Sequence, residues 1–289
     1  MSTQTGNFGT VNSVPNLRSW SITRTKANNK QASSALQDGT NREVGPLDWS
    51  GSYSAYGHSP VHMPGSYISF VGYKNPSSAG DKATGDILSG SALIQSVAIT
   101  WDFATNAPIS YVANFGGHGD LTESTGAPYS DSAVPTFFPP CVGKIELVQT
   151  PTPVRVSHVK QAVLTISKEV KTEVNSGTSA ASGKCTTMRY PGGPVDWSLA
   201  ITRSEGNVDA DFVEGAIVEL KLYVDATNFW HLKWGMVGDQ SGITVNRESG
   251  DVIQFTNNIE MKAVNLVTAT PTIGLIKLPG AGSNWWPAP

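Results

Sequence analysis

The chain of 289 residues is poor in charge and has no long apolar segment. Lys, Arg, Asp and Glu make up 15% of it, against about 25% in an ordinary soluble domain, and the net charge is −3. Without a run of about 18 apolar residues we expect no transmembrane helix, and without a basic patch before an apolar core we expect no secretory signal. Lys and Arg form no cluster, which argues against a protein that grips DNA phosphates.

Cysteine and histidine are also scarce. The two cysteines, Cys141 and Cys185, lie in unlike surroundings, and we expect free thiols in a chain without a secretory signal. His58 and His62 are spaced like metal ligands on a helix, but the prolines around them forbid a stable helix. A third ligand is missing as well, so the sequence predicts no metal site. Motifs for cofactor binding are also missing, and we expect no cofactor.

An internal repeat is the most informative feature of the chain. Residues 45–50 read GPLDWS and residues 193–198 read GPVDWS, about half the chain length apart. Four further blocks recur in the same order. They pair residues 17–25 with 159–167, 65–73 with 215–223, 97–115 with 243–259, and 142–147 with 273–278. Such a repeat indicates two related domains whose loops differ in length.

The repeat sets the domain boundaries that we expect. They are an N-terminal arm over 1–13, domain 1 over 14–149, a proline-rich linker over 150–155, domain 2 over 156–279 and a C-terminal arm over 280–289. The C-terminal arm carries Trp285 and Trp286, which would pack on their own domain or on a neighbouring chain. We regard them as a candidate inter-subunit arm.

Alternation of apolar and polar residues predicts strands. Val218, Leu220, Leu222 and Val224 form one half-buried strand, and a turn over 225–228 leads to a second strand with Trp230, Leu232, Trp234 and Met236. Only residues 207–214 suggest a helix, of one or two turns. The 29 glycines and 18 prolines favour short strands and turns. The predicted fold class is mostly β, with two tandem homologous sandwiches or rolled barrels, each with at most one short helix.

The two Asp-Trp-Ser elements allow two interpretations. Asp48 and Asp196 could be ligand carboxylates beside stacking Trp49 and Trp197, as in sugar binding. We favour a structural role, in which Gly-Pro turns the chain, Asp caps the turn and Trp fills the core.

Catalytic motifs are missing. No GxSxG, HExxH or phosphate-binding loop occurs, and no carboxylate pair stands out. We therefore predict no enzyme and no catalytic residue. His118 with Asp120, in the segment GGHGD, is the place where an enzyme would have to be sought.

The order of blocks resembles bacteriophage major tail tube proteins with a duplicated tube domain. The resemblance rests on the early strands LRSWSIT and VKQAVLT, the Asp-Trp-Ser strands, the segment DADFVEG, the hairpin VELKLYVDATNFWHLKWG and the closing SGITVNRESGDVIQFTNNIEM. It implies a β-sandwich subunit whose hairpins join into a continuous inner barrel. Rings would stack into a tube, with two domains per chain giving a trimer with pseudo-six-fold symmetry.

The resemblance also implies partners and a location. The chain would contact itself within and between rings, the tape-measure protein and passing DNA in the lumen, and terminator, baseplate and sheath proteins. It would reside in the virion tail after assembly in the host cytoplasm, away from membranes. The candidate lumen or inter-subunit hairpin spans 218–237, with Val218, Leu220, Leu222, Val224, Trp230, Leu232 and Trp234; its counterpart in domain 1 is 67–73 with 93–101.

Three alternatives remain open at this point. The first is another β-sandwich protein of the tail, baseplate or capsid surface. The second is a tandem carbohydrate-binding module that uses Trp49, Trp101, Trp197 and Trp230 as exposed platforms. The third is an enzyme centred on His118.

Overall fold

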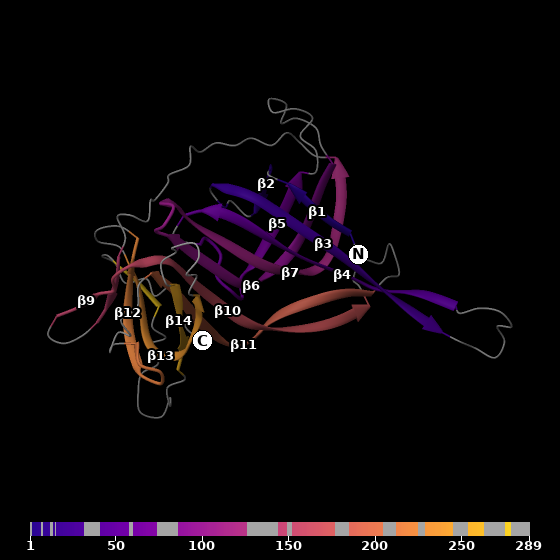
Figure 1. Cartoon of the computed structure of the whole chain (residues 1–289). Helices are drawn as coiled ribbons and strands as arrows, with labels where there is room; N and C mark the ends of the chain where they lie inside the picture. Colours follow the sequence, from indigo (N-terminus) through magenta and orange to yellow (C-terminus); the bar gives the residue numbers. More distant parts are fainter. Residues whose placement is uncertain are drawn as a thin grey trace. The chain divides into compact units, whose positions relative to one another are not determined.

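The chain folds almost entirely into β-strands, as the computed structural model in Figure 1 shows. The structure describes residues 2–6, 8–11, 14, 16–31, 41–57, 60–73, 86–125, 144–148, 152–176, 185–204, 212–224, 229–244, 254–262 and 275–278. These ranges contain no α-helix. Among the same residues, nothing helical is long and apolar enough to cross a bilayer. Most of the short helix expected over 207–214 lies outside the described residues.

The strands of the first half of the chain are β1 (Ser2–Gly6), β2 (Phe8–Val11), β3 (Leu17–Gln31), β4 (Asn41–Tyr56), β5 (Tyr67–Tyr73), β6 (Asp86–Asp102), β7 (Ala107–Thr125) and β8 (Ile145–Leu147). Those of the second half are β9 (Val154–Arg155), β10 (Val159–Ser176), β11 (Cys185–Ser204), β12 (Ile217–Tyr223), β13 (Phe229–Thr244), β14 (Gln254–Met261) and β15 (Leu275–Leu278).

The two halves pair their strands in the same order. Hydrogen-bonded neighbours run β3-β4-β7-β6-β5-β2 in the first half and β10-β11-β14-β13-β12-β8 in the second. The last pair of repeated sequence blocks behaves differently, because β8 pairs with β12 whereas β15 pairs with β13. This order of pairing is compatible with a duplicated unit, and the tandem boundaries 14–149 and 156–279 stay a prediction.

A closed β-barrel lies within this arrangement. The path β4-β7-β6-β10-β11 returns to β4 through a parallel contact between Thr186 and Leu47. The other strands extend the sheet from the barrel strands. Closure removes two sheet edges that would otherwise be open to other chains.

Two compact units divide the chain differently from the tandem segments. Unit 1 contains Met1–Val97, Tyr111–Pro135 and Ser167–Val195; unit 2 contains Ala98–Ser110, Thr136–Ile166 and Asp196–Pro289. Each unit therefore draws on both halves of the chain, because the long strands β6, β7, β10 and β11 contribute residues to both.

Aromatic side chains dominate the core of unit 1. The ring of Trp20 meets Phe70 edge to face at 5.4 Å between centroids, and Phe70 lies 5.6 Å from Phe115. Tyr53 and Tyr111 pack edge to face at 6.1 Å. Burial raises the pKa of Tyr111 to about 12 and raises that of Tyr53 as well, so both phenols are neutral at physiological pH.

Alternating aliphatic residues form the core of unit 2. The burial pattern of β12 repeats every second residue, as expected for a strand with one face on a core. Its fully buried aliphatic residues include Ile99, Ile109, Ala162, Leu164, Ile201, Leu220, Leu232 and Ile259.

Candidate assembly interface

The two Asp-Trp-Ser elements lie inside strands, so the expected Gly-Pro turn is wrong. Residues 45–50 belong to β4 and residues 193–198 belong to β11. In β4 the register with β3 shifts by one residue around Gly45 and Pro46. Proline cannot donate to the ladder, and a bulge accommodates it without a turn. Sequence reasoning mistook a bulge for a chain reversal.

Trp49 is a core residue, with 1% of its surface exposed. Its indole Nε1 donates a hydrogen bond of 2.9 Å to the Gly119 carbonyl, and its ring meets Phe115 edge to face at 6.1 Å. A Cβ at Gly117 would lie 2.2 Å from Nε1, so only glycine fits there. Trp49 thus fastens β4 to β7 and offers no surface to a ligand.

Asp48 belongs to a polar cluster that sequence analysis missed. The Nη2 of buried Arg189 donates to Asp48 Oδ2 at 2.8 Å, and Nη1 lies 2.8 Å from Oδ1. Nη1 also donates to the Gly117 carbonyl at 2.8 Å. We call Asp48, Trp49, Gly117, His118 and Arg189 the Arg189 cluster. It links β4, β7 and β11 within three residues of the contact between Thr186 and Leu47 that closes the barrel.

His118 has a structural setting in this cluster. Its Nδ1 lies 2.7 Å from the carbonyl oxygen and 3.2 Å from the backbone nitrogen of Arg189. Its ring packs edge to face between Tyr67 and Tyr190, at 4.9 and 5.4 Å. Within the described part of the chain, both hydrogen-bond contacts of this ring are with the Arg189 backbone and neither is with Asp120. This setting favours packing over acid–base chemistry.

The second Asp-Trp-Ser element has no counterpart of the Arg189 cluster. Asp196 is exposed, and its Oδ1 accepts a hydrogen bond of 2.8 Å from the Trp197 backbone nitrogen. Trp197 is 3% exposed and packs over Gly235, where a Cβ would lie 3.0 Å from its ring. Both tryptophans are buried, whereas Asp48 pairs with Arg189 and Asp196 bonds the adjoining backbone.

The hairpin over 218–237 forms as expected from the alternation. β12 and β13 pair antiparallel from Tyr223 opposite Phe229 to Ile217 opposite Met236. β8 occupies the other edge of β12, and β14 and β15 occupy the other edge of β13. Its edges are thus taken by strands of the same chain, and its role in a lumen stays a prediction.

A bulge changes the exposed face of β13. Val218 pairs with Gly235 and Leu220 with Leu232, so β13 has one extra residue between these pairs. Trp234 sits there with a φ of 60°, an outlier for a bulky side chain. It is 48% exposed, and Met236 beyond it is 36% exposed. The strict alternation that placed Trp230, Leu232, Trp234 and Met236 on one face is therefore wrong after Leu232.

Glu219 and His231 make a side-chain pair across this hairpin. His231 Nε2 and Glu219 Oε1 form a short hydrogen bond. Burial lowers the pKa of His231, against the opposing effect of the Glu219 carboxylate, and nearby Lys233 and Lys221 lower it further. The imidazole is therefore harder to protonate than a free one.

The outer part of the β3–β4 hairpin presents an unpaired strand edge. β1 pairs with β3 only up to Arg24, whereas β4 follows β3 to the pair Gln31 and Asn41. No described strand pairs with the other edge of β3 from Thr25 to Gln31. We call residues 28–31 with 41–44 the β3–β4 ribbon; Figure 1 shows it reaching beyond the other strands of unit 1. Its length could not be read from the polar sequence TKANNKQ.

The remaining candidate residues are the cysteines, the other histidines and the C-terminal tryptophans. Cys185 is an exposed free thiol, and His62 is buried. The described residues hold no group of three or more side chains that could bind a metal ion. Outside the described residues lie His58, Cys141, Trp285 and Trp286.

Comparison with known proteins identifies no relative. No protein family matches the chain, and no curated protein is significantly similar to it in sequence.

Proposed function

We propose that the chain is a structural subunit that assembles with copies of itself into a phage tail tube. The observation that carries the proposal is the β3–β4 ribbon with its free edge on β3. A two-stranded ribbon is marginally stable alone in water, and a free edge pairs readily with another strand. Lysines at positions 26 and 30 discourage indiscriminate pairing, which favours a matched edge on another copy.

The repeated order of strand pairing supports the same proposal. A chain with two equivalent halves supplies two equivalent contact sets, so three chains give six positions in a ring. The resemblance to duplicated tail tube proteins rests on the same blocks that form these strands. A net charge of −3 suits a lumen through which DNA must slide.

The alternatives receive less support. A carbohydrate-binding module was expected to expose Trp49, Trp101, Trp197 and Trp230, but these are 1, 1, 3 and 1% exposed. An enzyme centred on His118 gains no support from its setting, because this half-buried ring packs edge to face between Tyr67 and Tyr190 and its Nδ1 contacts the Arg189 backbone. Another tail, baseplate or capsid-surface protein would share the same fold and is separated from the tube only by the shape of the assembly.

Shortening the ribbon tests the proposal. Residues 29–43 are replaced by an Asn-Gly turn, which removes the ribbon and leaves the paired body of β3 and β4. We expect wild-type protein to sediment as rings or longer assemblies and the variant to sediment as a monomer. The matched control removes residues 75–84 and should assemble. A variant that assembles as well as the wild type would contradict a role for the ribbon.

A further inference from the structure

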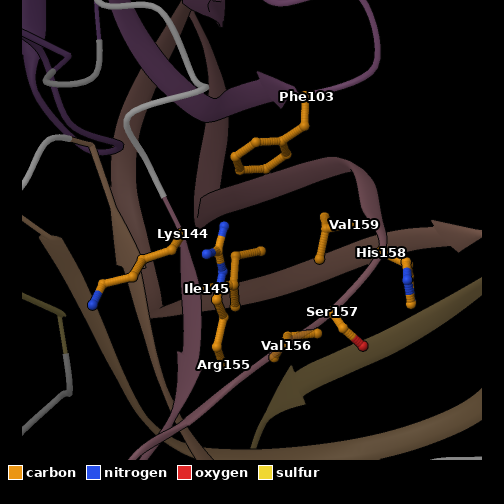
Figure 2. A pocket seen from close by; sticks show the side chains of 8 residues that line it. All are labelled: Phe103, Lys144, Ile145, Arg155, Val156, Ser157, His158 and Val159. Carbon is orange, nitrogen blue, oxygen red and sulfur yellow. The ribbon is translucent and has the colours of Figure 1, made fainter.

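Unit 2 contains a cavity of about 570 Å³ that the proposed function does not use. Figure 2 shows its lining side chains, which come from β8, β9, the start of β10 and the turn after β6: Phe103, Lys144, Ile145, Arg155, Val156, Ser157, His158 and Val159. The cavity falls within the range of 300–1,000 Å³ that is typical of small-molecule sites.

Backbone hydrogen bonds hold the walls of the cavity in place. Val156 donates to the Ile145 carbonyl at 2.9 Å, and Phe103 donates to the Lys160 carbonyl at 2.9 Å. The loop between β9 and β10 is fixed from β11, because Ser204 donates to the His158 carbonyl at 3.0 Å. The cavity is therefore built from anchored elements, which lowers the cost of ordering it around a ligand.

The ionisable groups that line the cavity are all basic. They are Lys144, Arg155 and His158, in a chain whose net charge is −3. Behind them, buried Arg203 donates from Nε to the Ser157 carbonyl at 3.0 Å and adds a further positive charge. This local excess of positive charge favours an anion.

Arg155 is the cation best placed to receive that anion. Lys144 is engaged by Glu146 at 2.5 Å, and Figure 2 shows its ammonium group directed away from Phe103. Arg155 is exposed, and Glu146, its opposite residue in the β8–β9 pair, forms its ion pair with Lys144. Its guanidinium group lies on the side of Ile145 that faces Phe103 (Figure 2). A guanidinium can bind an acidic group with two hydrogen bonds or stack on a flat ring.

Apart from Ser157, the rest of the lining is apolar. Phe103 offers a ring, and Ile145, Val156 and Val159 offer aliphatic surface. A simple inorganic anion would leave this surface wet, whereas a ligand with a flat apolar group would cover it. We propose that this cavity binds an aromatic small molecule that carries a carboxylate, phosphate or sulfonate group, with the acidic group on Arg155 and the ring against Phe103.

The experiment uses anilinonaphthalene sulfonate, whose fluorescence rises in apolar sites, on the full chain. We expect saturable one-site binding to the wild type and about tenfold weaker binding to Arg155→Gln, from the lost charge-assisted hydrogen bonds. Val159→Asp places a like charge on the apolar wall and should weaken binding further. The matched control Arg18→Gln, on the ring of Tyr56 in unit 1, should bind as the wild type does.

Two further probes separate the contribution of the acidic group to binding from that of the apolar rings. Phenylnaphthylamine, which lacks the sulfonate, should bind the wild type about as weakly as the sulfonate binds Arg155→Gln. Inorganic sulfate alone should displace the dye only at far higher concentration. Equal dye binding by wild type and Arg155→Gln, or equal binding of the neutral and acidic dyes, would overturn the proposal. Neither outcome depends on assembly, because the lining residues all belong to one chain and the wild type and its variants are compared in the same assembly state.

Discussion

At the scale of single residues, Arg189 carries the clearest energetic consequence. It is 8% exposed and its guanidinium is shared between Asp48 and the carbonyls of Trp49 and Gly117. Arg189→Ala leaves those acceptors without their donor, and we expect a loss of about 2–4 kcal/mol in the free energy of unfolding. Urea denaturation measures it.

Two further variants separate the contribution of the Arg189–Asp48 ion pair from that of the hydrogen bonds between Arg189 and the backbone carbonyls. Asp48→Asn should cost less than Arg189→Ala because the Asp48 side chain is 39% exposed. The double variant should cost less than the sum of the two. Strict additivity would show that the ion pair contributes nothing beyond the carbonyl contacts.

Trp234 allows a test of backbone strain. At an ordinary strand position glycine is about 0.5–1 kcal/mol less stabilising than alanine. At Trp234, with a φ of 60°, we expect the reverse, because alanine keeps the left-handed strain and glycine relieves it. Thermal unfolding of Trp234→Gly and Trp234→Ala measures the order. At the neighbouring Lys233 we expect the alanine variant to be more stable than the glycine variant. If alanine is also the more stable residue at position 234, the bulge assigned there is refuted.

His231 makes stability depend on pH in a definite direction. Its pKa in the folded chain lies below the ordinary value of about 6.5, so the unfolded chain binds the proton first as pH falls. The free energy of unfolding therefore declines as pH drops below about 6.5. His231→Gln should flatten this decline. If the free energy of unfolding of His231→Gln declines with pH as steeply as that of the wild type, the decline does not come from His231.

At the scale of elements, the sequence predicts strands better than it predicts their connections. The hairpin of β12 and β13 follows from plain alternation, because one face is buried and each second residue must be apolar. Trp234 could not be placed, since a bulge of one residue inverts the faces and leaves no mark in composition. The Gly-Pro bulge in β4 was missed because the same dipeptide also starts turns.

Long-range partners were beyond the sequence altogether. Arg189 and Asp48 are 141 residues apart in the sequence and meet only because β4 and β11 close the barrel. A lone arginine in the strand segment TTMRY was the single available signal. The same holds for the basic cavity, whose members Phe103, Lys144 and Arg155 come from separate elements.

The β3–β4 ribbon yields a prediction about stability as well as assembly. Removing residues 29–43 leaves the pairs from Leu17 opposite Ala55 to Lys26 opposite Leu47 intact. A ribbon without further strands contributes little to the free energy of unfolding. At a protein concentration low enough for both to be monomeric, we expect the shortened chain to unfold within about 1 kcal/mol of the wild type in urea. A much larger loss would show that the ribbon is part of the fold rather than a contact arm.

At the scale of the whole molecule, two features point to assembly. The halves repeat one order of strand pairing, and one long hairpin offers an unpaired edge. A closed ring satisfies both, because head-to-tail contacts that close leave no edge exposed. Under the proposed function, these are the features by which the chain would build a tube.

Electron microscopy of the purified protein tests this account most directly. The mass of the particles in solution is measured beside it over a wide range of protein concentration. We predict rings or tubes whose end views have three-fold or six-fold symmetry, with a mass of three chains per ring. A protein that stays monomeric at every concentration, and that forms no ring even when the other tail components are supplied, would contradict the account.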